Sequence, residues 1–147
     1  MTAARKNKIL NPLHDIQRQA EAEFQPYGDI EIVSTYGQPE AEYAALARTC
    51  GLFDQPHRGI LSLTGPERLD FLNRILTNQT WDKETKTGLT AGEGRYAFLL
   101  TSNGRIVTDM NILERGDATL LELEARRLDV VKTFLLKYIF TEKVRLE

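Results

Sequence analysis

The sequence has 147 residues, of which 41% are hydrophobic and 27% charged, and its formal net charge at pH 7 is −2. This length and composition are typical of one ordinary globular domain and argue against a disordered chain. The charge is balanced and forms no dense Lys/Arg stripe, so we expect neither nucleic acid nor an anionic membrane as a partner. No apolar run is long enough to span a bilayer, and the first residues lack the apolar core of a signal peptide.

A single cysteine, Cys50, excludes an internal disulfide and a cysteine-rich zinc or iron–sulfur site made by this chain alone. We therefore predict no metal site, and we expect the cytoplasm or another reducing compartment. Cys50 follows a helical pattern, and only His14 and His57 are available as bases. We interpret it as a buried small hydrophobe rather than a nucleophile.

The first part of the chain predicts a flexible N-terminal tail over residues 1–10, followed by folded structure over residues 11–147. Apolar residues at helical spacing predict an amphipathic helix over residues 11–24: Leu13, Ile16, Ala20 and Phe24. From there to residue 78 we expect, in order, a strand at 30–33, a helix over 39–49, a strand over 58–65 and a helix over 66–78.

The second part begins with a polar, glycine-bearing stretch over residues 79–92, which we interpret as a mobile loop or a weak hairpin arm. The elements expected after it are strands over 94–101, 106–113 and 117–125, a helix over 126–140 and a last strand at 142–147. This order predicts an α+β fold, an antiparallel sheet with helices packed on one face.

Residues 94–113, GRYAFLLTSNGRIVTDMNIL, predict a hairpin with a charge in the middle of its second strand. Asn103-Gly104 between two apolar runs is typical of a two-residue type I′ turn. The register that follows pairs Ser102 with Arg105, Leu100 with Val107, Phe98 with Asp109, and Tyr96 with Asn111, all on one face.

The opposite face of this hairpin is expected to be core, with the residues Ala97, Leu99, Thr101, Ile106, Thr108, Met110 and Ile112. The first face mixes apolar groups with a phenol, a carboxylate and an amide, which suits a flat, partly polar ligand. The alternative is that Asp109 and Asn111 lie on the solvated side of a half-exposed sheet. A three-residue loop would reverse the two faces.

Two stretches carry motifs that occur in the same order in a known family. GLFDQPHRGILSLTGPERLDFLNRILTNQ is similar to a family segment in which Gly-Leu-Phe-Asp precedes a strand, and Gly-Pro opens a helix ending in Thr-Asn. GRYAFLLTSNGRIVTDMNIL is similar to a tyrosine-containing strand, a turn and an aspartate-containing strand. The chain therefore resembles the glycine cleavage T-protein (aminomethyltransferase) family over roughly residues 10–147.

The resemblance implies that residues 11–147 are the N-terminal part of an aminomethyltransferase-type folate-binding domain, one half of a duplicated domain in a longer protein that also has a second half and a C-terminal domain. It also implies that tetrahydrofolate lies against these strands. It places the family's folate-contacting tyrosine at Tyr96 and its functional aspartate at Asp109, which would stabilise a developing positive charge or accept a proton. Asn111 shares their predicted face. Arg58 either pairs with a folate carboxylate or is a surface residue at a strand start. His57 matches a family histidine in position, with a capping or packing role equally open.

Some residues depart from the T-protein pattern. Thr108-Asp109 stands where two adjacent aspartates are usual, and Pro56-His57-Arg58 stands where the family tends to have Ser-His-Met. These departures, with GRIVTD and YGQPEAEYAAL, resemble the YgfZ-type branch, folate-binding relatives associated with iron–sulfur protein maturation and tRNA modification. The Lys-Gly-Cys-Tyr-x-Gly-Gln-Glu motif of that branch does not occur in this sequence.

Three functions are therefore open. The first is a folate-binding maturation or repair factor of the YgfZ type. The second is an aminomethyltransferase that moves a one-carbon unit from a lipoyl-bound group to tetrahydrofolate, and the third is a half-domain with no ligand. The expected partners are folate and the remainder of the same polypeptide.

Overall fold

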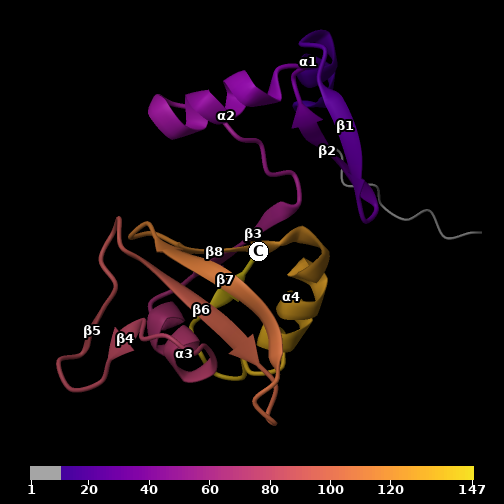
Figure 1. The fold of residues 1–147 in the computed structure, drawn as a ribbon. Coiled ribbons are helices and arrows are strands. Elements are labelled where there is room, and N and C mark those ends of the chain that lie inside the picture. The colour runs from indigo at the N-terminus through magenta and orange to yellow at the C-terminus, as the bar shows by residue number, and fades with distance from the viewer. Residues whose placement is uncertain (1–10) are drawn as a thin grey trace, which may run out of the picture. The chain divides into compact units, whose positions relative to one another are not determined.

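The computed structural model describes residues 11–147, so the tail predicted at residues 1–10 lies outside the described residues. The chain divides into two compact units, one ending at His57 and the other spanning Arg58–Glu147 (Figure 1). The domain bounds predicted at residues 11–147 stay a prediction.

The N-terminal unit contains two helices and a hairpin: α1 (His14–Gln19), β1 (Glu23–Tyr27), β2 (Ile30–Thr35) and α2 (Pro39–Arg48). The predicted strand at 30–33 and the helix over 39–49 are confirmed. The predicted helix over 11–24 is wrong after Gln19, because Glu21 has a φ of 59° and Phe24 pairs with Val33 in the hairpin. Ile16 is 62% exposed, so the helical spacing of apolar residues does not mark a buried face here.

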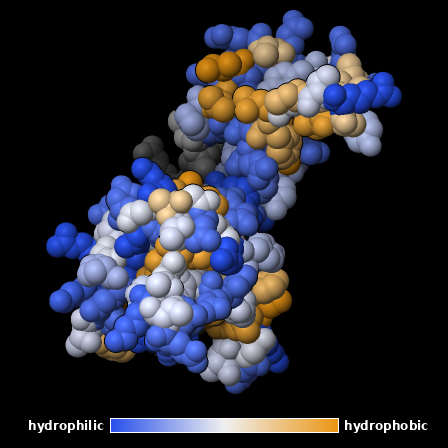
Figure 2. Space-filling view, turned by 90° about the vertical axis from the view of Figure 1, so that its left-hand side faces the viewer, coloured by the Kyte–Doolittle hydropathy of each residue, from blue (hydrophilic) through white to orange (hydrophobic). Residues whose placement is uncertain are grey.

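Most apolar side chains of this unit lie at its surface. Among its described residues, Ile30 is the only buried hydrophobic one. Figure 2 shows hydrophobic residues gathered on its surface, and the large exposed ones are Leu13, Ile16, Tyr36, Tyr43, Leu46, Leu52 and Phe53. The unit therefore has very little hydrophobic core of its own.

The second unit is built on a five-stranded antiparallel sheet with the strand order β6-β7-β8-β3-β9. Its elements are β3 (Arg58–Thr64), α3 (Arg68–Ile75), β4 (Trp81–Asp82), β5 (Thr87–Gly88), β6 (Gly94–Leu100), β7 (Ile106–Glu114), β8 (Thr119–Glu124), the short helix η1 (Ala125–Arg127), α4 (Leu128–Leu136) and β9 (Arg145–Leu146). The predicted α+β fold is confirmed. Residues 79–92 contain the small β4–β5 hairpin, and their mobility stays a prediction.

Helices α3 and α4 cover the same face of this sheet (Figure 1). Alternate strand residues point into the core, and they are Leu61, Leu63, Ala97, Leu99, Met110, Ile112, Leu121 and Leu123. The helices contribute Leu69, Phe71, Leu72, Val131 and Leu135. All of these side chains are less than a tenth exposed, so one face of the sheet is a dry core. No helix of this unit covers the other face.

The tip of the β6–β7 hairpin differs from the prediction. Gly104 has a φ of 76°, whereas the φ of Asn103 is not positive. The amide of Thr101 donates to the carbonyl of Arg105 at 2.8 Å. These features define a loop of residues 102–104 with a left-handed glycine rather than a type I′ turn. Such a loop would reverse the two faces of the hairpin, as its register is displaced by one residue.

A β-bulge restores the predicted faces. The register shifts between Leu99 and Leu100, and Leu100 lies opposite Ile106 instead of Val107. Below the bulge Phe98 lies opposite Asp109, as predicted. Within the expected core face, Ala97, Leu99, Thr108, Met110 and Ile112 are buried, whereas Thr101 and Ile106 lie beyond the bulge and are exposed. The prediction of a core position is therefore wrong for those two residues.

Candidate functional site

The uncovered face of the second unit's sheet carries all of the site residues predicted from the sequence. We call this surface the open face, and its central residues are Arg58, Ile60, Tyr96, Phe98, Asp109, Asn111 and Glu122. Tyr96 lies opposite Asn111, Asn111 opposite Glu122, and Glu122 opposite Ile60. The helices cover only the opposite side of the sheet. The side chains of the open face therefore stay in contact with water, and this is why the face can carry polar residues.

Tyr96 and Asp109 are diagonal neighbours on the open face and are joined directly. The Tyr96 hydroxyl donates to Asp109 Oδ2 at 2.9 Å. This hydrogen bond to the carboxylate raises the pKa of the Tyr96 phenol, because the bond is lost when the phenol ionises, and the charge of Asp109 disfavours a phenolate. Phe98 meets the Tyr96 ring edge-on, with 5.3 Å between the ring centroids. The pair thus presents aromatic surface next to a carboxylate.

A second group joins three strands on the same face. The Arg58 guanidinium donates through Nε and Nη2 to the two carboxylate oxygens of Glu122, with 2.9 Å between Nη2 and Oε2. Asn111 Nδ2 also donates to Glu122 Oε2, at 2.6 Å. The hydrogen bond with Glu122 is the main cause that raises the pKa of Arg58, and the charges of Asp109 and Glu124 add to it. Glu122 therefore holds both Arg58 and Asn111 in place.

Glu122 was not predicted as a site residue. The sequence TLLELE alternates apolar and acidic residues, which indicates a strand with a polar face. Its register against the hairpin, however, depends on the turn at residues 115–118, so the alternation alone does not bring Glu122 next to Asn111. The structure also changes the interpretation of Arg58, because its guanidinium already has a carboxylate partner within the sheet.

The open face can accept hydrogen bonds and stack against a ring. Within the described residues, no hydrogen bond to Asp109 Oδ1 is found, so this oxygen is available to a ligand N–H or to a developing positive charge. Tyr96 is 51% exposed, which leaves the aromatic surface beside Asp109 accessible. The central residues of the open face include the carboxylates of Asp109 and Glu122 and the guanidinium of Arg58. Their net charge is negative, so the face favours N–H donors or cations over anions.

Two other residues considered from the sequence belong to the N-terminal unit. His57 ends the N-terminal unit, where its ring lies 5.1 Å from that of Tyr27 and its Nδ1 is buried with no hydrogen-bond partner in the described part of the chain. Cys50 is exposed, so the expectation of a buried cysteine is wrong.

Among residues 11–147, no group of three or more His, Cys, Asp or Glu side chains is arranged to hold a metal ion. No helix of the same range is long and apolar enough to cross a membrane.

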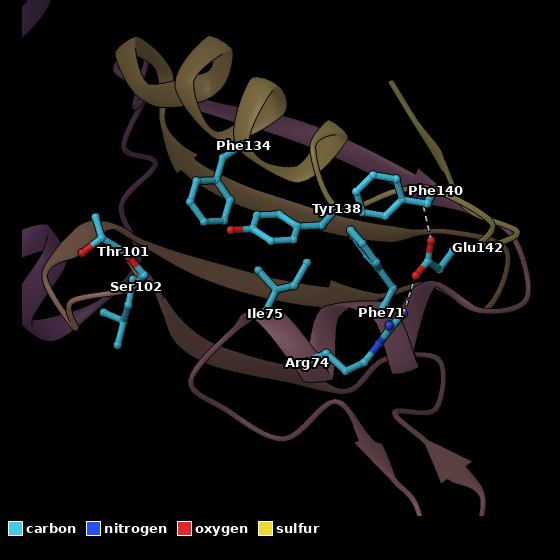
Figure 3. A pocket seen from close by; sticks show the side chains of 10 residues that line it. Phe71, Arg74, Ile75, Thr101, Ser102, Phe134, Tyr138, Phe140 and Glu142 are labelled. Atoms are coloured by element: carbon cyan, nitrogen blue, oxygen red, sulfur yellow. Dashed lines mark hydrogen bonds and ion pairs between the residues drawn. The ribbon is translucent and has the colours of Figure 1, made fainter.

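A pocket of about 420 Å³ lies on the helix side of the sheet, away from the open face. Figure 3 shows the rings of Phe134 and Tyr138 beside it, with Arg74 and Glu142 joined by a hydrogen bond at its rim. The Arg74 Nη2 to Glu142 Oε1 distance is 3.1 Å. None of the predicted folate-contacting residues lines this pocket.

The second unit is thus an α+β structure whose antiparallel sheet has one face buried against two helices and one polar face. The sequence model described as the GCVT N-terminal domain matches residues 13–131, and the chain belongs to this family.

Named relatives agree with that family. The chain is 28% identical over 119 residues to an aminomethyltransferase of Bacillus subtilis (strain 168). This match covers 80% of this chain and 31% of that protein. It is 30% identical over 101 residues to an aminomethyltransferase of Symbiobacterium thermophilum, over 69% of this chain and 25% of that protein. The chain therefore spans about a third or less of the length of these relatives.

A solved structure has the same fold. The crystal structure of the glycine cleavage system aminomethyltransferase T from Bartonella henselae superposes with a TM-score of 0.75 at 22% identity. The superposition covers 92% of this chain and 37% of that one.

Proposed function

We propose that the open face binds a reduced folate, and that the chain acts as the N-terminal portion of an aminomethyltransferase-family protein. The observation that carries the proposal is the pair formed by Tyr96 and Asp109. The Tyr96 hydroxyl donates to Asp109 Oδ2, and no hydrogen bond from the described residues reaches Asp109 Oδ1. Family membership supports it, and we carry over to Tyr96 and Asp109 the folate-contacting tyrosine and the functional aspartate that the sequence resemblance implies.

The chemistry of the face suits that ligand. A reduced pterin keeps a flat pyrimidine ring and carries ring N–H donors, which match aromatic surface beside a carboxylate acceptor. Asp109 would orient these donors and stabilise positive charge that develops on a folate nitrogen during one-carbon transfer. Arg58 contributes indirectly, because its guanidinium fixes Glu122, which in turn holds Asn111.

Calorimetric titration with tetrahydrofolate tests the proposal, on the 147-residue chain and on the longest natural polypeptide that contains it. Asp109→Asn should weaken binding by roughly 1.5–3 kcal/mol, the contribution of a hydrogen bond to a charged group. Asp117→Asn is the matched control, because Asp117 is an exposed carboxylate in the β7–β8 turn and should leave affinity unchanged.

The stability of the variants separates a binding role from a structural one. Asp109 lies on the open face, on the side of the sheet away from the core, so Asp109→Asn should unfold within a few degrees of the parent. Equal affinity of parent and variant would refute the binding role. We expect the 147-residue chain to bind more weakly than the longer polypeptide, because one face alone leaves a flat ligand half in water.

The residues that depart from the T-protein pattern help to distinguish a maturation factor from a transferase. Thr108 is buried on the core side and Asp109 is on the open face, so the Thr108 departure from the T-protein pattern leaves the open face unchanged. Arg58 does lie on the open face. Because the sequence resemblance associates this departure with the YgfZ-type branch, it supports a maturation or repair factor of that type. The names of the relatives favour the second candidate, an aminomethyltransferase of the glycine cleavage system.

An activity assay distinguishes these roles. Production of methylenetetrahydrofolate by the longer polypeptide from a lipoyl-bound aminomethyl group, with ammonia and the free lipoyl thiol as the other products, would support the transferase. Folate binding without that turnover would support the maturation factor. If neither polypeptide binds folate, the third function considered from the sequence remains, a half-domain with no ligand.

A further inference from the structure

One edge of the five-stranded sheet is only partly paired. Strand β9 runs beside the end of β3, with Leu146 opposite Leu63 and Arg145 opposite Thr64. Ser62 and Glu147 continue this ladder, because each amide donates to the carbonyl of the other, at 2.8 and 2.9 Å. Along residues 58–61, β3 has β8 on one side and, within the described chain, no strand on the other.

The direction of the main-chain groups on this edge follows from the ladder. Hydrogen-bonded and non-hydrogen-bonded residues alternate along an antiparallel strand. The amide and carbonyl of Ser62 point to β9, so those of Ile60 point the same way, whereas those of Gly59 and Leu61 point to β8. Ile60 therefore presents a donor and an acceptor at the sheet edge, and its side chain is 56% exposed on the open face.

We propose that the polypeptide following Glu147 in a longer protein continues β9 along β3, as an antiparallel strand that pairs with Ile60 and extends to Arg58. Two observations favour this occupant over a foreign strand. Glu147 is already hydrogen-bonded in the ladder, so the next residue leaves it beside β3. The relatives also have ample chain, since the match covers 31% of the Bacillus subtilis protein.

The register determines where the added side chains lie. Because Glu147 faces Ser62, the second residue after Glu147 faces Ile60 and the fourth faces Arg58. Side chains alternate, so both of these residues belong to the open face, while the residue between Glu147 and the partner of Ile60 points to the core beside Leu61. If the proposed function is correct, this strand adds ligand-contacting positions to the Arg58 side of the site.

Amide hydrogen exchange measured by NMR tests the pairing without folate, so its failure leaves the proposed function untouched. In the 147-residue chain the Ile60 amide should exchange rapidly, and in the longer polypeptide it should slow by on the order of a hundredfold or more. The amides of Gly59 and Leu61 are internal controls, because β8 protects them in both polypeptides. Equal, rapid exchange of Ile60 in both would overturn the proposal.

A proline substitution gives a second readout. Proline is tolerated where the missing N–H faces away from the sheet, so Ile60→Pro should lower the unfolding midpoint of the longer polypeptide much more than that of the 147-residue chain. An equal loss in both would contradict the proposal. Ile60 protection in the 147-residue chain that rises with protein concentration would identify a second copy as the occupant, and would also overturn it.

Discussion

At the scale of single residues, the open face depends on how its two carboxylates are engaged. Glu122 accepts from both Arg58 and Asn111, so its charge is compensated within the sheet. Asp109 accepts from the neutral Tyr96 hydroxyl, which leaves its full charge on the face. The two acids therefore differ in role: one organises the neighbouring side chains, and the other is directed to a ligand.

The titration of Tyr96 reports this arrangement. Its pKa is raised above the ordinary value of 10.0, chiefly by the hydrogen bond to Asp109. A raised folded-state pKa means that the bond's contribution to stability is complete below pH 10 and is lost as the pH rises through the folded-state pKa. Phenolate absorbance of the parent minus that of Tyr96→Phe isolates this residue among the five tyrosines.

In the Asp109→Asn background the same difference titration should return the pKa of Tyr96 toward its ordinary value, because the carboxylate acceptor is gone. A pKa that stays raised in that background would show that Asp109 is not the cause.

The candidate site could be predicted in part from the sequence. Alternation along one hairpin was enough to place Tyr96, Asp109 and Asn111 together, because the side-chain period of a strand is two. Arg58 was suggested only by the family resemblance, and Glu122 was missed. Arg58 lies on β3, which pairs with β8 far along the sequence. Glu122 lies on β8, whose register against the neighbouring strand β7 depends on the turn at residues 115–118. Local periodicity carries no information on either pairing.

At the scale of elements, the β6–β7 hairpin shows how two errors can cancel. The loop is one residue longer than Asn103-Gly104 predicts, and the bulge at Leu99/Leu100 takes up that residue. The core face then stays in register because Ala97 and Met110 have to remain buried. The first helix could not be delimited in the same way, since the apolar spacing of residues 13–24 fits a helix and the hairpin partner of Phe24 is not a local signal.

Arg68, at the start of α3, ties that helix to the β7–β8 turn. Its guanidinium pairs with Glu114 and donates to Thr119 Oγ1 at 3.0 Å and to the carbonyl of Gly116 at 2.8 Å. The Glu114 side chain is 1% exposed. Arg68→Ala should therefore cost about 3–5 kcal/mol of unfolding free energy in urea, because it leaves a buried carboxylate without its cation.

Arg74→Ala is the matched control on the same helix. The Arg74 side chain is 43% exposed and pairs with Glu142 at 3.1 Å, so its loss should cost less than about 1 kcal/mol. Similar costs for the two variants would mean that Arg68 is no more important than a surface ion pair.

At the scale of the whole molecule, the two units differ in how they are stabilised. The second unit buries a continuous cluster of leucine, valine, phenylalanine and methionine side chains between sheet and helices. The N-terminal unit relies on polar contacts, such as Gln17 Nε2 donating to Asp54 Oδ2 at 2.7 Å, and α2 has no buried residue. Hydrophobic burial is the dominant favourable term in folding, so the stability of the chain should reside in residues 58–147.

A polypeptide of residues 58–147 should therefore fold by itself and unfold in urea with a midpoint close to that of the whole chain. Leu121→Ala should cost about 2–5 kcal/mol in both, because Leu121 is fully buried. Leu52→Ser should cost almost nothing in the 147-residue chain, since Leu52 is fully exposed.

Amides of α2 should exchange much faster than those of β7, because local opening is easy where few apolar contacts are broken. If residues 58–147 fail to fold, or if α2 is as protected as β7, the N-terminal unit contributes stability that its surface does not account for.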